Sequence, residues 1–250
     1  MFAIIGGSGL AKLANLEVTK RQVMRTPYGE PSGALTFGQI NGVEVVFLAR
    51  HGYGHTIPPH EINYRANVWA LHSLGIDGII SVASVGGIRA DMQPGTLVIP
   101  DQILDYTWGR KHTFFEGPEQ PVTHVDFTHP YSEELRAHLF AALDGVGEVG
   151  VLGSTYACTQ GPRLETAAEV RRLERDGADI VGMTGMPEAT LARELGVKYA
   201  ALAVVANWAA GKGNSADNVS MDGIQSTLEG AMSRVREILV AFVAQPVVAD

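Results

Sequence analysis

The sequence has little of what marks exported, membrane-bound or disulfide-stabilised proteins. Its only cysteine, Cys158, cannot form a disulfide within the chain, which is typical of a reducing compartment. Its most apolar stretch, Tyr199 to Ala206, is far shorter than the roughly 20 residues that cross a bilayer, and no basic segment precedes an apolar one after Met1. We therefore expect a cytoplasmic protein with no membrane partner.

Positive charge is also scarce. The chain has 19 Lys and Arg against 27 Asp and Glu, and no basic run is longer than Arg171-Arg172, so nucleic acid is not an expected partner. With 46% hydrophobic and 18% charged residues, the chain has the apolar material for a packed core and too little charge for disorder. We expect one domain over residues 1–250.

Short apolar runs alternate with helical patterns, which predicts an α/β fold in which helices flank a mixed central β-sheet. Strands are expected at residues 2–5, 35–40, 43–49, 78–82, 96–99, 151–157, 179–181 and 199–206. Helices are expected at 62–74, from the capping box Thr166-Ala-Ala-Glu169 to Gly177, from Pro187 to Gly196, and at 221–242. Asn41-Gly42 predicts a tight hairpin, and residues 109–130 form the longest irregular segment.

Several predicted strands end next to a polar donor. The loop Gly6-Gly7-Ser8-Gly9 offers backbone amides and a hydroxyl that suit an anion. Arg50 and His51 follow another strand, and a guanidinium there binds phosphate in fork geometry. Ser84 follows a third strand, and Thr184 stands before a helix start. Each residue alone is as readily explained by local structure, but together they favour one shared oxyanion such as inorganic phosphate.

Other uses of these residues are less well supported. The glycine loop does not complete the dinucleotide pattern, because Lys12 stands at the third glycine position, so no nicotinamide cofactor is expected. His51, His55 and His60 are candidate metal ligands, but glycines and prolines between them disfavour a rigid site and no carboxylate or thiol completes the set. We expect no metal.

Two further polar residues are suited to recognising a purine base by hydrogen bonds. Glu165 only accepts hydrogen bonds, and Asn207 both donates and accepts, so together they complement N1–H and O6 of hypoxanthine or guanine. Taken alone, Glu165 could complement a helix dipole and Asn207 could serve a turn. Cys158 has no identifiable base and is expected to be inert.

Five blocks of the sequence share their content, order and spacing with a known family. They are Ile4-Ile5-Gly6-Gly7-Ser8-Gly9-Leu10, Ala49-Arg50-His51-Gly52, Asn63-Tyr64-Arg65-Ala66-Asn67, Gln160-Gly161-Pro162-Arg163 with Glu165-Thr166, and Gly182-Met183-Thr184-Gly185-Met186-Pro187-Glu188. Over nearly the whole chain they resemble the trimeric purine nucleoside phosphorylase and methylthioadenosine phosphorylase family. The resemblance implies the nucleoside phosphorylase fold, a homotrimer with sites near subunit interfaces, and no cofactor. It also implies that phosphate, as a co-substrate, attacks C1′ of a nucleoside and releases the purine and a ribose 1-phosphate.

The resemblance also implies roles for single residues. The family's phosphate positions fall on the set already drawn from strand ends: Ser8, Arg50, His51, Ser84 and Thr184. Met183 stands at the position of the methionine that contacts ribose in the family. His124 stands at the position of the histidine that a neighbouring subunit contributes to the site. Ala83 departs from the Thr of methylthioadenosine phosphorylases, so one hydroxyl is absent.

The base and 5′ positions imply a particular substrate. Adenine-specific members carry aspartates at the positions of Asn207 and Ala209 and a Ser at that of Glu165, whereas Glu165 and Asn207 look like the pair of 6-oxopurine nucleoside phosphorylases. Met221 stands where methylthioadenosine phosphorylases place an apolar side chain and purine nucleoside phosphorylases a histidine. The pattern implies an enzyme that converts S-methyl-5′-thioinosine to hypoxanthine and 5-methylthioribose 1-phosphate, with Glu165, Asn207 and His51 as catalytic residues. The alternatives are a general 6-oxopurine nucleoside phosphorylase, a methylthioadenosine phosphorylase and, from another class, a nucleoside-binding protein without turnover.

Overall fold

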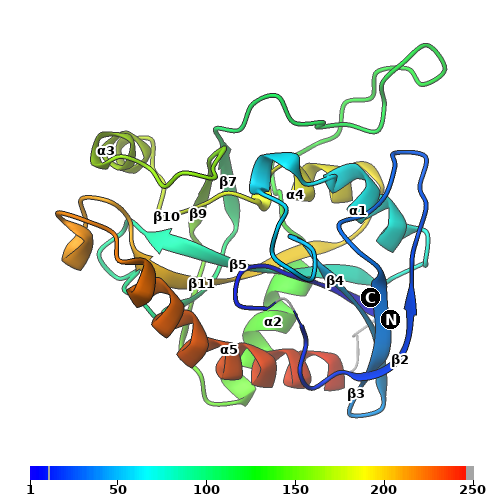
Figure 1. Ribbon diagram of the computed structural model, residues 1–250, viewed down its shortest axis with the longest axis horizontal. Coiled ribbons are helices and arrows are strands. Elements are labelled where there is room, and N and C mark those ends of the chain that lie inside the picture. The colour runs from blue at the N-terminus through cyan, green and yellow to red at the C-terminus, as the bar shows by residue number, and fades with distance from the viewer. Residues whose placement is uncertain (11, 246–250) are drawn as a thin grey trace.

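The computed structural model describes residues 1–10 and 12–245, in which one large mixed sheet is covered by helices (Figure 1). The strands are β1 (Phe2–Gly6), β2 (Glu17–Gln22), β3 (Leu35–Ile40), β4 (Val43–Ala49), β5 (Gly78–Gly87), β6 (Leu97–Ile99), β7 (Gln102–Asp105), β8 (Gly150–Leu152), β9 (Thr155–Cys158), β10 (Ile180–Gly182) and β11 (Tyr199–Trp208). The helices are α1 (Tyr64–His72), α2 (Glu133–Gly145), α3 (Ala167–Arg175), α4 (Gly185–Glu194) and α5 (Met221–Ala244), with short 3-10 turns η1 (Pro59–Glu61) and η2 (Gly213–Ser215). The expected α/β class is confirmed.

β5 organises the sheet. It pairs in parallel with β1 and β11, and β1 pairs in parallel with β4, so these four strands run in one direction. β10 pairs with the carboxyl-terminal end of β5, at Gly86 and Gly87, in the antiparallel sense. Beyond β10, the sheet continues with β9 and then β7. Because parallel strands end at one edge of a sheet, the segments that follow β1, β4 and β11 converge there, which is where open α/β sheets bind ligands.

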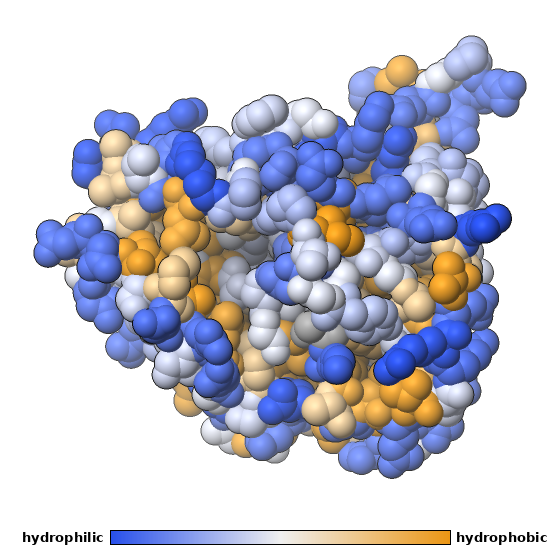
Figure 2. Space-filling view, viewed as in Figure 1, coloured by the Kyte–Doolittle hydropathy of each residue, from blue (hydrophilic) through white to orange (hydrophobic). Residues whose placement is uncertain are grey.

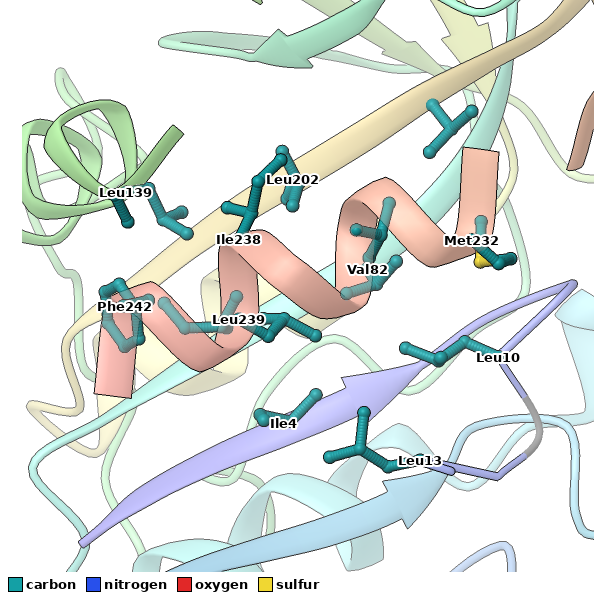
Figure 3. Packing of buried hydrophobic residues seen from close by; sticks show 14 of the residues in the cluster. Ile4, Leu10, Leu13, Val82, Leu139, Leu202, Met232, Ile238, Leu239 and Phe242 are labelled. Atoms are coloured by element: carbon teal, nitrogen blue, oxygen red, sulfur yellow. The ribbon is translucent and has the colours of Figure 1, made fainter. Parts of the chain in front are cut away.

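Two apolar layers cover the central strands, which explains why β5 and β11 are apolar on both faces. On one face, α2 and α5 pack on the strands, and Figure 3 shows Ile238 and Leu239 of α5 beside Val82 and Leu202. On the other face, the buried side chains of α1 and α4 form a second cluster with β1, β4 and β11. Because both faces are packed, the sheet edge is held rigidly.

The local signals in the sequence are mostly confirmed. Asn41 and Gly42 both have positive φ, 49° and 81°, as a two-residue hairpin between antiparallel β3 and β4 requires. The Thr166 capping box is present at the start of α3, and α5 runs along its apolar face as expected. The loop 109–130 has no helix or strand among its described residues and extends from the body of the molecule (Figure 1).

Other boundaries differ from expectation. The single strand expected at 151–157 is wrong, because Gly153 has a φ of 96° and separates β8 from β9, which pair with different neighbours. The strand expected to end at Val82 continues to Gly87, since β11 and β10 both pair with its second half. Helix α2 and strands β2 and β7 were not expected. Among the described residues, no helix combines the length and apolar character that a bilayer crossing needs.

Candidate active site

A cavity of 480 Å³ lies at the edge where β1, β4 and β11 end. Nine of the ten predicted site residues line it: Ser8, Arg50, His51, Ser84, Glu165, Met183, Thr184, Asn207 and Met221. The tenth, His124, is exposed on the loop 109–130 and does not line this cavity. The fold therefore gathers into one space residues that span most of the sequence.

Arg50 lines the cavity and is only 1% exposed. Its Nε and Nη2 donate to the two carboxylate oxygens of Glu188 at 2.8 and 2.9 Å, Nη2 also donates to Ser81 Oγ at 2.6 Å, and Nη1 donates to the Val82 carbonyl at 3.0 Å. The expected fork toward phosphate is wrong, because the fork faces Glu188. A guanidinium has five N–H groups, so one N–H on Nη1 remains for a ligand. A Cβ added to Gly7 would come within 2.8 Å of Nη1, so only glycine leaves room there.

Glu188 holds the Arg50 guanidinium in place, a contact that the sequence did not indicate. It is fully buried and also accepts hydrogen bonds from Ser81 Oγ and from the Tyr199 hydroxyl, both at 2.8 Å. Burial alone would lower the pKa of Arg50, but the charge and hydrogen bonds of Glu188 raise it above its ordinary value. The pair has no net charge, so Arg50 presents one oriented donor rather than an isolated cation.

His51 is 7% exposed and lies beside Arg50 in the cavity wall. Its Nδ1 is 2.8 Å from the Ile57 carbonyl, which can only accept, so Nδ1 carries the proton and the neutral ring offers Nε2 as an acceptor. Burial, together with the charge of Arg50, lowers the pKa of His51 to about 4. His51 is therefore neutral at pH 7. Within the described part of the chain, no three His, Cys, Asp or Glu side chains are grouped to hold a metal.

Hydroxyl groups complete this part of the cavity. Thr184 is 7% exposed, and its side chain forms no capping hydrogen bond at the start of α4. Met186 and Pro187 have non-helical backbone angles, so the regular part of the helix, which was expected to start at Pro187, begins just beyond it. Ser84 lies within β5 instead of after it. With Gly7, Ser8 and one N–H of Arg50, these groups form a cradle of neutral and charge-assisted donors suited to an oxyanion.

Asn207 lines the same cavity directly after a bulge in β11. The pairing of β11 with β5 is regular up to Val205 and resumes at Asn207, with Ala206 as the extra residue. A bulge changes the direction of the side chains that follow it, and both Ala206 and Asn207 line the cavity. Asn207 Nδ2 donates to the Trp208 carbonyl at 2.6 Å, which leaves one amide N–H and Oδ1 for a ligand.

Glu165 faces the same cavity from the loop that follows β9. Thr159 Oγ1 donates a hydrogen bond of 2.6 Å to Glu165 Oε1. Burial raises the pKa of Glu165 above its ordinary value, and the hydrogen bond from Thr159 opposes this rise. The sequence indicated Glu165 but not Thr159.

Arg110 joins two loops of the site, although nothing in the sequence singled it out. Its Nη2 donates to the carbonyls of Thr159 and Gln160 at 3.2 and 2.9 Å, and its Nη1 donates to those of Met183 and Met186 at 2.9 and 2.6 Å. The loop that carries Glu165 and the loop that carries Met183 are therefore fixed relative to each other. Cys158 is buried, and burial raises the pKa of its thiol to about 12, which agrees with the expectation of an inert cysteine.

One wall of the cavity is apolar. It is made by Val219 and by the first turns of α5, with Met221, Ile224 and Leu228. On the face seen in Figure 2, apolar atoms gather between α3 and the start of α5, next to a hollow in the surface. The site thus combines an anion cradle, a pair of polar residues suited to a purine edge, and an apolar wall.

The chain resembles known proteins along most of its length. A family model described as the phosphorylase superfamily matches residues 1–244. A Pseudomonas syringae pv. tomato protein named probable S-methyl-5′-thioinosine phosphorylase is 52% identical over 239 residues, 96% of each chain. The 6-oxopurine nucleoside phosphorylase of Pyrococcus furiosus is 50% identical over 214 residues, 84% of this chain and 80% of that protein.

A solved structure agrees with the fold. Methylthioadenosine phosphorylase from Schistosoma mansoni, in complex with adenine, matches with a TM-score of 0.92 and 34% identity over 97% of this chain and 90% of that one. The family match spans every strand that forms the cavity. The chain therefore belongs to the phosphorylase superfamily and has the nucleoside phosphorylase fold.

Proposed function

We propose that the protein is a pentosyltransferase that cleaves S-methyl-5′-thioinosine with inorganic phosphate, giving hypoxanthine and 5-methylthioribose 1-phosphate. The observation that carries the proposal is that Glu165 and Asn207 line one cavity with the anion cradle around Arg50. The Pseudomonas relative, named for this reaction, supports it at 52% identity.

Base recognition follows from the hydrogen-bonding capacity of Glu165 and Asn207. The base N1–H donates to the Glu165 carboxylate, and O6 accepts from the free amide N–H of Asn207. Adenine would direct the N1 lone pair at the carboxylate, and one buried polar group without a partner costs about 1–3 kcal/mol. The site is therefore suited to 6-oxopurines.

Phosphate binds in the cradle as hydrogen phosphate. Ser8, Ser84, Thr184 and the free N–H of Arg50 donate to its oxygens, and His51 Nε2 accepts from its P–OH group. A phosphate oxygen forms a bond to C1′ as the bond from C1′ to N9 breaks, and the purine leaves with the electron pair. The purine takes up a proton from solvent, and the phosphate ester releases its P–OH proton to solvent. The bound anion stabilises the positive charge that develops on the sugar, and Asn207 stabilises the charge on the base. Neither a metal nor a cofactor enters these steps.

The apolar wall contacts the 5′-methylthio group, while Met183 lies against the ribose. Burying one CH₂ contributes only about 0.8 kcal/mol, so selectivity at this end is weaker than selectivity for the base. A second candidate, a general 6-oxopurine nucleoside phosphorylase, is favoured by the Pyrococcus relative and by the exposure of Met221, which is 58%. The two functions differ only in the 5′ group.

We place the enzyme in the cytoplasm as a homotrimer. The single buried thiol supports a reducing compartment. His124 is exposed on the extended loop 109–130, a position from which a neighbouring subunit could receive it, and this supports a trimer in which each site takes His124 from another copy.

Initial rates on three nucleosides test the function. With phosphate present, we expect S-methyl-5′-thioinosine to react fastest, inosine more slowly, and S-methyl-5′-thioadenosine slowest, with the released base identified by mass. Inosine reacting faster than S-methyl-5′-thioinosine would select the second candidate. Adenine released faster than hypoxanthine would refute both.

Asn207→Asp tests the assignment at the base. The substituted carboxylate cannot donate to O6 but can accept from the amino group of adenine. We expect slower 6-oxopurine turnover and a higher ratio of adenine to hypoxanthine release. An unchanged ratio in a folded variant would mean that Asn207 does not contact the base.

A further inference from the structure

The carboxylate of Glu165 has an unusual environment for a group that must accept a hydrogen bond from substrate. It is partly buried, and burial favours its protonated form. The neighbouring cation, Arg163, is held by two hydrogen bonds of 2.8 and 2.7 Å to Glu169. Within residues 1–10 and 12–245, Glu165 forms no ion pair, and the hydrogen bond that its carboxylate accepts from another side chain comes from Thr159. Its own backbone N–H is a weaker influence that also lowers the pKa of Glu165.

Thr159 is itself held in place by the backbone. Its N–H donates to the Gly182 carbonyl at 2.8 Å, and its own carbonyl accepts from Arg110 at 3.2 Å. These contacts fix the hydroxyl where it reaches Glu165 Oε1 at 2.6 Å, while the alternative acceptor, the Gly182 carbonyl, is 3.3 Å away. The shorter distance indicates that the hydroxyl proton is directed at Glu165.

We propose that Thr159 is a positioning residue that keeps Glu165 ionised in a fixed orientation and makes the site selective for hypoxanthine over guanine. The Thr159 hydroxyl takes one of the two acceptor sites on Oε1 and leaves both sites on Oε2, so Oε2 is the oxygen better able to accept from a ligand. Hypoxanthine has one donor on this edge, N1–H, and needs one oxygen. Guanine has two adjacent donors, N1–H and the 2-amino group, which pair best with both oxygens of a free carboxylate. The proposal rests on the proposed function and refines its substrate class.

Thr159→Val and Thr159→Ser form a matched pair for the test. Valine keeps the shape and removes the hydroxyl, whereas serine keeps the hydroxyl. For each variant, kcat/KM for inosine is measured against pH at saturating phosphate, together with the ratio of kcat/KM for guanosine to that for inosine. Urea unfolding establishes that each variant is folded.

In Thr159→Val, we expect the acidic limb of the pH profile to move up by about one pH unit, because Glu165 loses the hydrogen bond that favours its ionised form. We also expect the guanosine-to-inosine ratio to rise by about tenfold, since Oε1 then has both of its acceptor sites available to the 2-amino group. Thr159→Ser should match the wild type in both measurements. A role limited to packing predicts neither change.

A folded Thr159→Val variant with the wild-type acidic limb and the wild-type ratio would overturn the proposal, as would a Thr159→Ser variant that behaves like Thr159→Val. Failure of the proposed function has a different signature, namely that the wild type itself releases adenine faster than hypoxanthine.

Discussion

Removing the charge of Glu188 tests whether the anion cradle depends on a neutralised arginine. In Glu188→Gln the side chain keeps its shape, but an amide NH₂ replaces one oxygen of a carboxylate that accepts from Arg50, Ser81 and Tyr199. Arg50, 1% exposed, would then be a buried cation without its counter-charge.

Removing one partner of a buried ion pair destabilises a protein by about 3–5 kcal/mol. This is a large part of the usual total of about 5–15 kcal/mol. An exposed pair such as Lys198 with Glu134, whose side chains are 47% and 38% exposed, should contribute no more than about 1 kcal/mol. Glu134→Gln is therefore a suitable control.

Urea unfolding at pH 7 measures the difference. With an unfolding slope of about 1–3 kcal/mol per molar, Glu188→Gln should lower the midpoint by more than about 1 M, and Glu134→Gln by much less. Phosphate should raise the midpoint of Glu188→Gln more than that of the wild type, because the anion supplies the missing counter-charge. Equal midpoints for Glu188→Gln and the wild type would refute the view that Glu188 compensates Arg50.

Two further variants test the same part of the cavity. The pKa of His51 is lowered to about 4, below its ordinary value near 6.5, so neutral His51 contributes stability that is present above pH 6.5 and is lost as the pH falls toward 4. The free energy of unfolding should therefore fall less between pH 7 and pH 4 in His51→Asn than in the wild type, by up to about 3 kcal/mol. Urea unfolding at several pH values in this range would detect the difference. Gly7→Ala would place a Cβ 2.7 Å from the Val82 carbonyl and 2.8 Å from Arg50 Nη1, so we expect a higher KM for phosphate and about 1–3 kcal/mol lower stability. Gly145→Ala, where a Cβ meets nothing within 4 Å, is the control, and equal phosphate KM values for the two variants would contradict this view of the cradle.

The sequence predicted which residues meet but not how they are bonded. Ser8 and Arg50 follow β1 and β4, whose ends are adjacent because the strands are parallel, so the meeting of their side chains could be expected from strand order alone. The partner of Arg50 could not, because Glu188 lies 138 positions away and reaches it through the packing of α4 on the sheet. The orientation of a buried charge is set by tertiary contacts that leave no local pattern.

The base end shows the same limit. Glu165 and Asn207 could be recognised by residue type, since few side chains complement a 6-oxopurine edge. The hydrogen bond from Thr159 and the bulge at Ala206 depend on backbone positions that the sequence does not specify. A threonine next to a strand end and an alanine in an apolar run are both unremarkable without the fold.

The extra residue in β11 separates the segment that is proposed to contact the base from the regular part of the strand that precedes it. Pairing with β5 is regular through Val205 and resumes at Asn207 and Trp208, one residue out of step. The extra residue therefore changes the direction of the side chains beyond it relative to the part of the strand before it. Under the proposed function, the four consecutive positions from Asn207 to Ala210 are a compact target for redesigning nucleobase preference.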